Sequence, residues 1–216
     1  MLFKRFKAEL GRVLAGGAPK VPLPDIDRKH GVWNHIDLDW MAAMVAMVPG
    51  DFAEIGVHYG LAFRRVAVLA HEQRKMAHAF DSFSGLAEPG PRDGQNYPKG
   101  KFDIGGPETF VIQMNKAGVP RHYYRLWPGY IPHCFEGVAA DSGFSFVIVD
   151  VDHHQPTVDS LAWVAPRVSR RGILALDDYI PHAPALATMA IDEFLARESG
   201  FDVIAQFNQH LILRKR

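Results

Sequence analysis

The segments FSFVIVD (residues 144–150) and GILALDD (residues 172–178) are uninterrupted apolar runs that each end in aspartate. Apolar runs of this length, without alternating polar residues, predict strands that are buried on both faces. The stretch between them, at residues 157–168, has the pattern of a helix. Strands and helices in this order are typical of a parallel sheet that is covered by helices on both sides.

The same alternation extends in both directions along the chain. We expect further strands at residues 52–57, 76–80, 122–126, 202–206 and 210–214, with the last two paired as a hairpin. We expect helices at residues 39–48, 61–71, 107–117 and about 183–198, and a long loop rich in Gly and Pro at 84–106. The predicted fold class is therefore α/β, with a doubly wound, mostly parallel, seven-stranded Rossmann-like sheet. Ligands of such sheets bind at the edge where the carboxyl ends of the strands meet.

The N-terminus predicts a separate appendage. Residues 1–30 hold a basic amphipathic stretch, MLFKRFKAELGRVL, followed by a linker rich in Gly and Pro, and residues 31–216 form the expected catalytic domain. Such a helix can pack on its own domain, on a neighbouring subunit of a homo-oligomer, or on a membrane. The first two readings are favoured. No apolar run approaches the ~20 residues needed to span a bilayer.

Composition excludes several other classes of protein. Hydrophobic residues make up 48% of the 216 residues, which is enough for a substantial core. The 24 basic and 24 acidic residues balance, so nucleic acid is not an expected partner. Cys134 is the only cysteine, which excludes an intrachain disulfide and a thiolate metal cage, and favours a packed thiol in a reducing, cytoplasmic setting.

Two early strand ends predict a nucleoside site. In DFAEIGVHYG (residues 51–60), Gly56 and Gly60 allow a sharp turn and a close backbone approach to a ligand, but the dinucleotide fingerprint is absent. Glu54 offers a carboxylate to a cationic amino-acid head group. Asp81 follows the second strand, where an acidic residue suits a ribose diol. Together these residues favour a nucleoside with a charged amino-acid tail.

Two later strand ends predict a metal site. Asp150 ends one strand and Asp177 and Asp178 end the next, so these three carboxylates converge if the strands are neighbours at about 4.8 Å. Their repulsion would raise at least one pKa, and a hard divalent cation such as Mg²⁺ would relieve it. Asp152 could then take a proton from an acidified hydroxyl. His153 and His154 could supply a base or a ligand, but more simply line or support the cavity.

Several stretches in this order and spacing resemble one known family. They are GDFAEIGVHYG (50–60), AFDSFSGLAEP (79–89), YPKGKF (97–102), RLWPGYIPHCF (125–135), FVIVDVDHHQPTVDSL (146–161) and GILALDDY (172–179). They resemble the macrocin O-methyltransferase family, metal-dependent enzymes that methylate sugar hydroxyls of macrolide and aminocoumarin antibiotics. The chain departs from that family at His153-His154, where an aliphatic–Tyr pair is usual, and in PGYIPHCFEG, which lacks the usual acidic-Thr-Leu-Pro ending.

The resemblance implies a role for each matching position. Glu54, Gly56 and Gly60 would form the S-adenosylmethionine turn, Asp81 and Ser82 would bind its ribose and adenine side, and Gly129 and Tyr130 would lie near the adenine. The Mg²⁺ ligands would be Asp150, Asp177 and Asp178, with Asp152 as the general base. The methyl group would pass directly from the sulfonium to a hydroxyl oxygen held at the metal. Independently of the resemblance, the glycines and prolines of the loop at 84–106 indicate a lid that excludes water during transfer.

The sequence therefore predicts an O-methyltransferase for a small hydroxylated acceptor, such as a sugar or a natural-product intermediate. Three alternatives stay open at this point. A catechol-type enzyme would use the same metal on a phenolic diol. A non-catalytic protein would keep only cofactor binding. A metal-dependent hydrolase would use the aspartates with His153 and His154, but would leave Glu54 and Asp81 unexplained.

Overall fold

The computed structural model describes residues 33–93, 96–181, 186–197 and 200–216. Seven strands form one sheet: β1 (Asp51–Ile55), β2 (Ala77–Asp81), β3 (Tyr124–Pro128), β4 (Phe144–Val149), β5 (Val168–Leu176), β6 (Phe201–Phe207) and β7 (His210–Lys215). The helices are α2 (His35–Met44), α3 (Phe63–Glu72), α4 (Pro107–Lys116), α5 (His154–Val164) and α6 (Leu186–Arg197), with short 3₁₀ turns at Arg121–Tyr123, His133–Phe135 and Ala165–Arg167. The predicted N-terminal helix and linker at residues 1–30 lie outside the described residues.

The sheet order is β3-β2-β1-β4-β5-β7-β6. The first five strands in this order are parallel, and β7 pairs antiparallel with both β5 and β6. The predicted fold class, the seven strands and the terminal hairpin are confirmed. The reversal of order between β1 and β4 opens a crevice at the carboxyl ends, where ligands of open α/β sheets bind.

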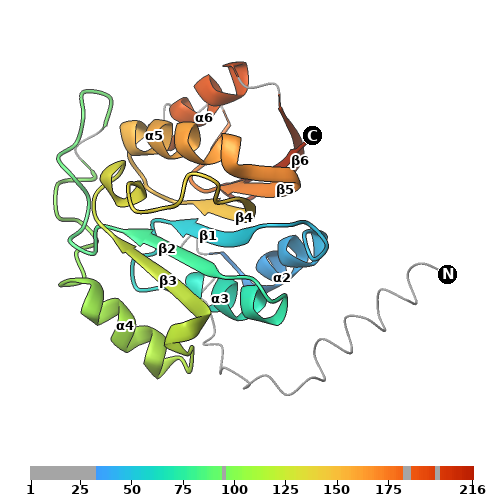
Figure 1. The fold of residues 1–216 in the computed structure, drawn as a ribbon. Helices are drawn as coiled ribbons and strands as arrows, with labels where there is room; N and C mark the ends of the chain where they lie inside the picture. Colours follow the sequence, from blue (N-terminus) through green and yellow to red (C-terminus); the bar gives the residue numbers. More distant parts are fainter. Residues whose placement is uncertain (1–32, 94–95, 182–185, 198–199) are drawn as a thin grey trace.

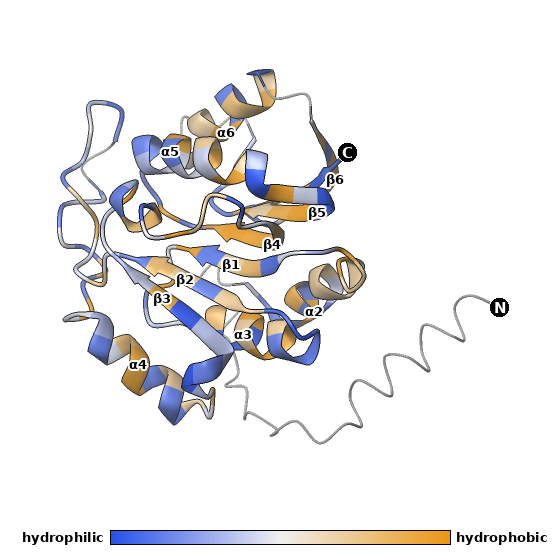
Figure 2. Cartoon of the chain, in the orientation of Figure 1, coloured by the Kyte–Doolittle hydropathy of each residue, from blue (hydrophilic) through white to orange (hydrophobic). Residues whose placement is uncertain are grey.

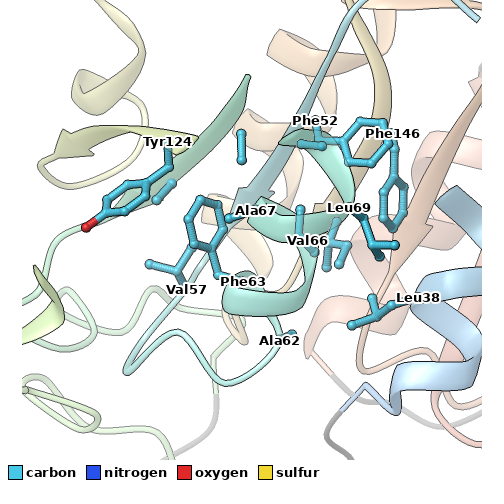
Figure 3. Close-up of a cluster of buried hydrophobic side chains, with 14 of the residues drawn as sticks. Leu38, Phe52, Val57, Ala62, Phe63, Val66, Ala67, Leu69, Tyr124 and Phe146 are labelled. Carbon is cyan, nitrogen blue, oxygen red and sulfur yellow. The ribbon is translucent and has the colours of Figure 1, made fainter. Parts of the chain in front are cut away.

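Alternate residues of each strand pack into two separate cores. Phe52, Phe146 and Ile148 face helices α2, α3 and α4, whereas Ala53, Val147 and Val149 face α5 and α6. Figure 3 shows part of the first core, where Phe52 and Phe146 lie in a T-shaped arrangement with ring centroids 5.3 Å apart. Figures 1 and 2 show the apolar strands enclosed between the two helical layers. Burial on both faces explains why these strands lack polar alternation.

Several boundaries differ from the predicted ones for physical reasons. Strand β5 begins at Val168 instead of Gly172, with a register shift where it pairs with β4. Helix α5 begins at His154, three residues earlier than expected, because Asp93 Oδ1 accepts the backbone N–H of His154 at 2.8 Å. Strand β3 begins at Tyr124, because Arg121–Tyr123 form a 3₁₀ turn after Pro120. Within the described ranges, no helix is long and apolar enough to cross a bilayer.

Candidate active site

A pocket of about 380 Å³ lies at the carboxyl ends of the parallel strands. Its walls come from the ends of β1, β2, β4 and β5 and, in the long loop, from residues 85–87, Tyr97 and Phe102. The predicted site residues that line it are Glu54, Gly56, Asp81, Ser82, Gly129, Tyr130, Asp150, Asp152, Asp177 and Asp178. Gly60 does not line this pocket. One cavity therefore brings together nearly all of the residues singled out from the sequence.

The turn after β1 needs glycine at two positions. Gly56 has φ +90°, and a Cβ there would stand 1.6 Å from the carbonyl oxygen of Asp150. Gly60 has φ +79°, and a Cβ there would meet the ring of Phe110 at 2.8 Å. Gly56 thus lets β1 and β4 close together under the pocket, whereas Gly60 lets the turn pack on α4. The role predicted for Gly60 in cofactor binding stays a prediction.

Glu54 is a buried carboxylate that faces the pocket. Its side chain is 3% exposed, and its Oε2 atom is buried without a hydrogen-bond partner. Burial raises the pKa of Glu54 well above its usual value, and the nearby charges of Asp81 and Asp177 raise it further. A buried polar atom without a partner is costly. A cationic ligand group in the pocket would supply the missing contact.

Asp81 and Ser82 stand at the end of β2 and organise the surrounding loops. Asp81 Oδ2 accepts the backbone N–H of His58 at 2.9 Å, and Oδ1 accepts that of Phe83 at 2.7 Å. Each carboxylate oxygen keeps a further lone pair for a ligand hydroxyl. The hydroxyl of Ser82 donates to the carbonyl oxygen of Gly85 at 2.7 Å, so it also closes a turn. Gly129 N–H donates to the Asp81 carbonyl oxygen at 2.9 Å, which places the Gly129-Tyr130 segment beside this end.

The four aspartates form the opposite side of the pocket. Strands β4 and β5 are neighbours, and Val149 pairs with Leu176, so the residues that follow them lie side by side as predicted. Asp152 and Asp178 both have positive φ, of 59° and 57°, which turns the chain sharply after each strand. Such conformations are tolerated by aspartate better than by most residues.

Burial and, after it, mutual repulsion raise pKa values in this cluster. Burial and then Asp177 raise the pKa of Asp150 well above its usual value. Burial and then Asp178 raise the pKa of Asp152 to about 7, and burial and then Asp177 raise the pKa of Asp178 to about 6. The sequence predicted that mutual repulsion raises at least one pKa in this cluster; the neighbouring carboxylates contribute to all three rises, although burial is the larger cause. The cluster therefore holds carboxyl groups whose ionised forms disfavour one another.

The donor set has the chemistry of a hard-cation site but not its geometry. Every candidate donor is a carboxylate oxygen, which Mg²⁺ and Ca²⁺ prefer. Among the described residues, however, no three His, Cys, Asp or Glu side chains are arranged as a group that could hold a metal ion. The aspartates line the same pocket, but no three of their carboxylates are placed to coordinate one ion. The predicted Mg²⁺ site therefore stays a prediction.

Sequence reasoning missed His210, which lies behind the aspartates. Its side chain is 2% exposed, its Nε2 is 3.1 Å from Asp177 Oδ1, and its ring stacks on Trp33 at 3.7 Å. The contact follows from the sheet, in which β7 pairs antiparallel with β5 and Leu176 lies opposite Leu211. In an antiparallel pair, the next residues outward, Asp177 and His210, are then neighbours.

The long loop contributes residues that were given no role in advance. Tyr97 and Phe102 line the pocket, and Lys101 Nζ stands 3.7 Å from the centroid of the Tyr97 ring. Burial, followed by the charges of Asp178 and the other three aspartates, raises the pKa of Tyr97. The aromatic rings of the loop thus cover the acidic side of the pocket. By contrast, Trp127 and Trp163 pack against Phe80 in the core on the α5–α6 face of the sheet.

Comparison with protein families agrees with this architecture. Residues 53–179, more than half of the chain, match the family described as Methyltransferase domain. The matched segment contains the ends of β1, β2, β4 and β5, and with them the aspartates and Glu54.

Two curated proteins from Streptomyces are similar to this chain. One is the 8-demethyl-8-(2,3-dimethoxy-alpha-L-rhamnosyl)-tetracenomycin-C 4'-O-methyltransferase of Streptomyces olivaceus, 27% identical over 61% of this chain and 54% of that protein. The other is the demethyldecarbamoylnovobiocin O-methyltransferase of Streptomyces niveus, 28% identical over 72% of this chain and 61% of that protein. The chain thus spans little more than half the length of these relatives.

Solved structures show the same fold. The O-methyltransferase NovP superimposes with a TM-score of 0.74 at 20% identity, over 84% of this chain and 78% of its own. The calicheamicin methyltransferase CalS11 superimposes with a TM-score of 0.71 at 19% identity, over 98% of this chain and 91% of its own.

Proposed function

The chain belongs to the methyltransferase-domain family, and we propose that it is an S-adenosylmethionine-dependent O-methyltransferase for a hydroxyl of a small molecule. Glu54 is the observation that carries this proposal. A buried carboxylate with an unpartnered oxygen faces the pocket and matches the ammonium group of the methionine tail. The ion pair would be shielded from water, where a charge-assisted hydrogen bond is strongest.

Other pocket residues would bind the ribose and the adenine of the cofactor. In this proposal Asp81 receives the ribose hydroxyls, with its carboxylate held in place by the amides of His58 and Phe83. Ser82, Gly129 and Tyr130 lie beside it and would flank the adenine. Gly56 and Gly60 shape the turn that the cofactor follows. The reacting methyl group would then point from this half of the pocket toward the aspartates.

The transfer itself needs only orientation and a proton acceptor. The acceptor oxygen attacks the methyl carbon, the carbon–sulfur bond breaks, and the electron pair stays on sulfur, so that S-adenosylhomocysteine is released. The hydroxyl proton passes to a carboxylate oxygen of Asp152, which lines the pocket after the sharp turn that follows β4. Alignment of oxygen, carbon and sulfur in a closed site would supply much of the acceleration.

We further propose a hard divalent cation, Mg²⁺ or a similar ion, held by Asp150, Asp177 and Asp178. The support is the chemistry of the donor set, with three carboxylates at neighbouring strand ends and raised pKa values for Asp150 and Asp178. When bound, such an ion supplies positive charge that makes a nearby hydroxyl more acidic. The side chains would have to move together to bind it. His210, stacked on Trp33, would fix the carboxylate of Asp177 from behind.

A sugar hydroxyl on a natural-product intermediate is the acceptor that we propose. The relatives from Streptomyces are named for transfer to a rhamnosyl derivative of tetracenomycin and to demethyldecarbamoylnovobiocin. The acceptor half of the pocket is lined by rings, among them Trp33, Tyr97 and Phe102, together with carboxylates. Aromatic faces and carboxylates suit a sugar ring with several hydroxyls. A phenolic diol is the alternative acceptor, and binding without turnover is the alternative function.

The first experiment is calorimetric titration of S-adenosylhomocysteine into the protein after metal removal, repeated with Mg²⁺. Binding is expected in the micromolar range or tighter, and it should be lost in Asp81→Ala. Transfer of labelled methyl groups to glycosides and to catechols then separates the two acceptor classes. Absence of S-adenosylhomocysteine binding to well-folded protein would refute the proposed function. Cofactor binding without transfer to any hydroxyl would favour the non-catalytic alternative.

A further inference from the structure

The long loop is fastened to helix α5 by a polar network that lies outside the catalytic residues proposed above. We call residues 84–106 the lid segment, of which residues 84–93 and 96–106 are described. Figure 1 shows it beside the carboxyl ends of the strands. Its two arms join through Leu86 N–H to Lys101 O at 2.8 Å and Gly100 N–H to Leu86 O at 2.9 Å. Because the arms are joined, a contact that fixes one described arm also restrains the other.

Asp93 is the first point of attachment. Its side chain is only 2% exposed. One carboxylate oxygen accepts the N–H of Gly90 at 2.8 Å, within the lid segment, and the other accepts the N–H of His154 at 2.8 Å, in the first turn of α5. Asp93 therefore caps a helix to which it is not adjacent in sequence. A carboxylate at a helix N-terminus also interacts favourably with the helix dipole.

His153 is the second point of attachment. Its side chain is 1% exposed, and its Nε2 lies 2.9 Å from the carbonyl oxygen of Tyr97. Because a carbonyl oxygen only accepts, Nε2 must carry the proton and donate. Its other nitrogen, Nδ1, lies 3.9 Å from Asp93 Oδ2. Nε2 is therefore occupied by the lid segment and offers no lone pair to a metal ion or to an acceptor hydroxyl.

His154 contributes a third, more exposed attachment. Its Nε2 lies 2.9 Å from Arg92 Nη1, and because a guanidinium only donates, this nitrogen must accept. Arg92 also pairs with Glu193 of α6 at 2.5 Å. Arg92 is about half exposed, so this pair contributes little by itself. It nevertheless continues the network from the lid segment to a second helix.

We propose that His153 is a positioning residue, which acts with Asp93 to hold the lid segment closed over the pocket. By fixing the backbone of Tyr97, it places the Tyr97 ring and the neighbouring Lys101 against the aspartates. The adjacent pair His153-His154 thus serves the closed lid, rather than proton transfer or metal binding. Its contribution to methyl transfer rests on the proposed function, whereas the attachment of the lid segment does not.

Amide hydrogen exchange of the whole chain, followed by mass spectrometry, tests this role. We compare His153→Leu, which removes the donor, with His153→Gln, which keeps one in a side chain of similar reach. In His153→Leu, amides of residues 97–103 should exchange about tenfold faster, as expected for losing one buried hydrogen bond. Amides of β4 and β5 should keep their protection. His153→Gln should stay within about threefold of the native protein, and exposed His122→Asn is the control.

Three results would overturn the proposal. One is unchanged exchange of residues 97–103 in folded His153→Leu, and another is an equal effect of Leu and Gln. The third is a uniform rise across the sheet, which would indicate a general loss of stability. If neither variant folds, Asp93→Ala carries the test, and it must produce the same local rise. Titration of S-adenosylhomocysteine into the same proteins reports separately on the proposed function, because exchange of the lid segment requires no cofactor.

Discussion

The backbone amide of His58 donates a hydrogen bond to Asp81 Oδ2 at 2.9 Å, so the turn after β1 is fastened to the end of β2. The other carboxylate oxygen accepts the amide of Phe83 at 2.7 Å. Asp81 therefore supports the walls of the pocket as well as offering lone pairs inside it. If Asp81 supports the pocket walls, its removal should lower stability. If it also binds the ligand, its removal should lower the affinity for the cofactor.

Asp81→Ala should lose both stability and cofactor affinity. Two backbone amides lose a charged acceptor, which should lower the free energy of unfolding by roughly 2–4 kcal/mol. The affinity of the folded fraction for S-adenosylhomocysteine should also fall, because the ribose hydroxyls lose their acceptor. Calorimetry reports this affinity separately from stability, because the titration can be corrected for the fraction of protein that is folded. Urea unfolding and calorimetry measure the two effects, with exposed Asp141→Ala as the control. Unchanged affinity in folded Asp81→Ala would remove Asp81 from the cofactor site.

Glu54→Gln should raise the stability of the protein and lower its affinity for the cofactor. The folded-state pKa of Glu54 is raised above its ordinary value of 4.5, so the folded protein binds more protons than the unfolded chain just above pH 4.5. Glu54 therefore lowers stability as pH rises from 4.5 through the raised pKa. Glutamine does not ionise, so the variant does not lose this stability. The difference in the free energy of unfolding between the variant and the native protein, measured in urea, should therefore grow as pH rises from 4.5 through the raised pKa. The affinity of the variant for S-adenosylhomocysteine should nevertheless fall about tenfold or more, because the ammonium group exchanges a charged acceptor for a neutral one. Equal affinity of the two proteins would contradict the head-group assignment.

The sequence alone predicted which site residues lie at the ends of the parallel strands. The ends of β1, β2, β4 and β5 carry Glu54, Asp81, Asp150 and Asp177, and parallel strands bring such ends together whatever the loops do. It was not sufficient for contacts between side chains on irregular segments. Asp93 and His154 are 61 positions apart, and no periodicity links a loop aspartate to a distant helix start. Likewise, the stacking of Trp33 on His210 depends on the path of the chain before α2.

Asp177→Asn should abolish the response to Mg²⁺. An ion that binds only the folded protein raises stability, by about 2.7 kcal/mol at one hundred times its dissociation constant. We expect thermal unfolding of the native protein to shift upward with Mg²⁺, that of Asp177→Asn to stay unchanged, and that of exposed Asp141→Asn to shift like the native protein. An equal shift in Asp177→Asn would place the ion elsewhere. Full methyl transfer in the presence of a strong chelator would contradict the metal proposal.

Cys134 should be inert toward thiol reagents in the folded protein. Its side chain is buried, and burial raises the pKa of its thiol to about 12. At pH 8 the reactive thiolate is then about a thousandfold rarer than for a thiol of pKa 9. Alkylation by iodoacetamide should be slow in native protein and fast in urea, with mass spectrometry as the readout. Rapid labelling of native protein at pH 8 would show that the thiol is accessible and would reopen a chemical role for it.

Gly56→Ala should be far more damaging than Gly118→Ala, although both glycines have positive φ, of +90° and +74°. A Cβ at Gly56 would overlap the carbonyl oxygen of Asp150 at 1.6 Å, whereas a Cβ at Gly118 meets nothing within 4 Å. Gly118→Ala therefore reports the cost of the backbone conformation alone, about 1–2 kcal/mol. Gly56→Ala must in addition separate β1 from β4, at a cost of roughly 4 kcal/mol or more. Urea unfolding of the two variants measures the difference. Similar losses would mean that the strand ends move apart easily, and would contradict the role of Gly56 in closing the sheet beneath the pocket.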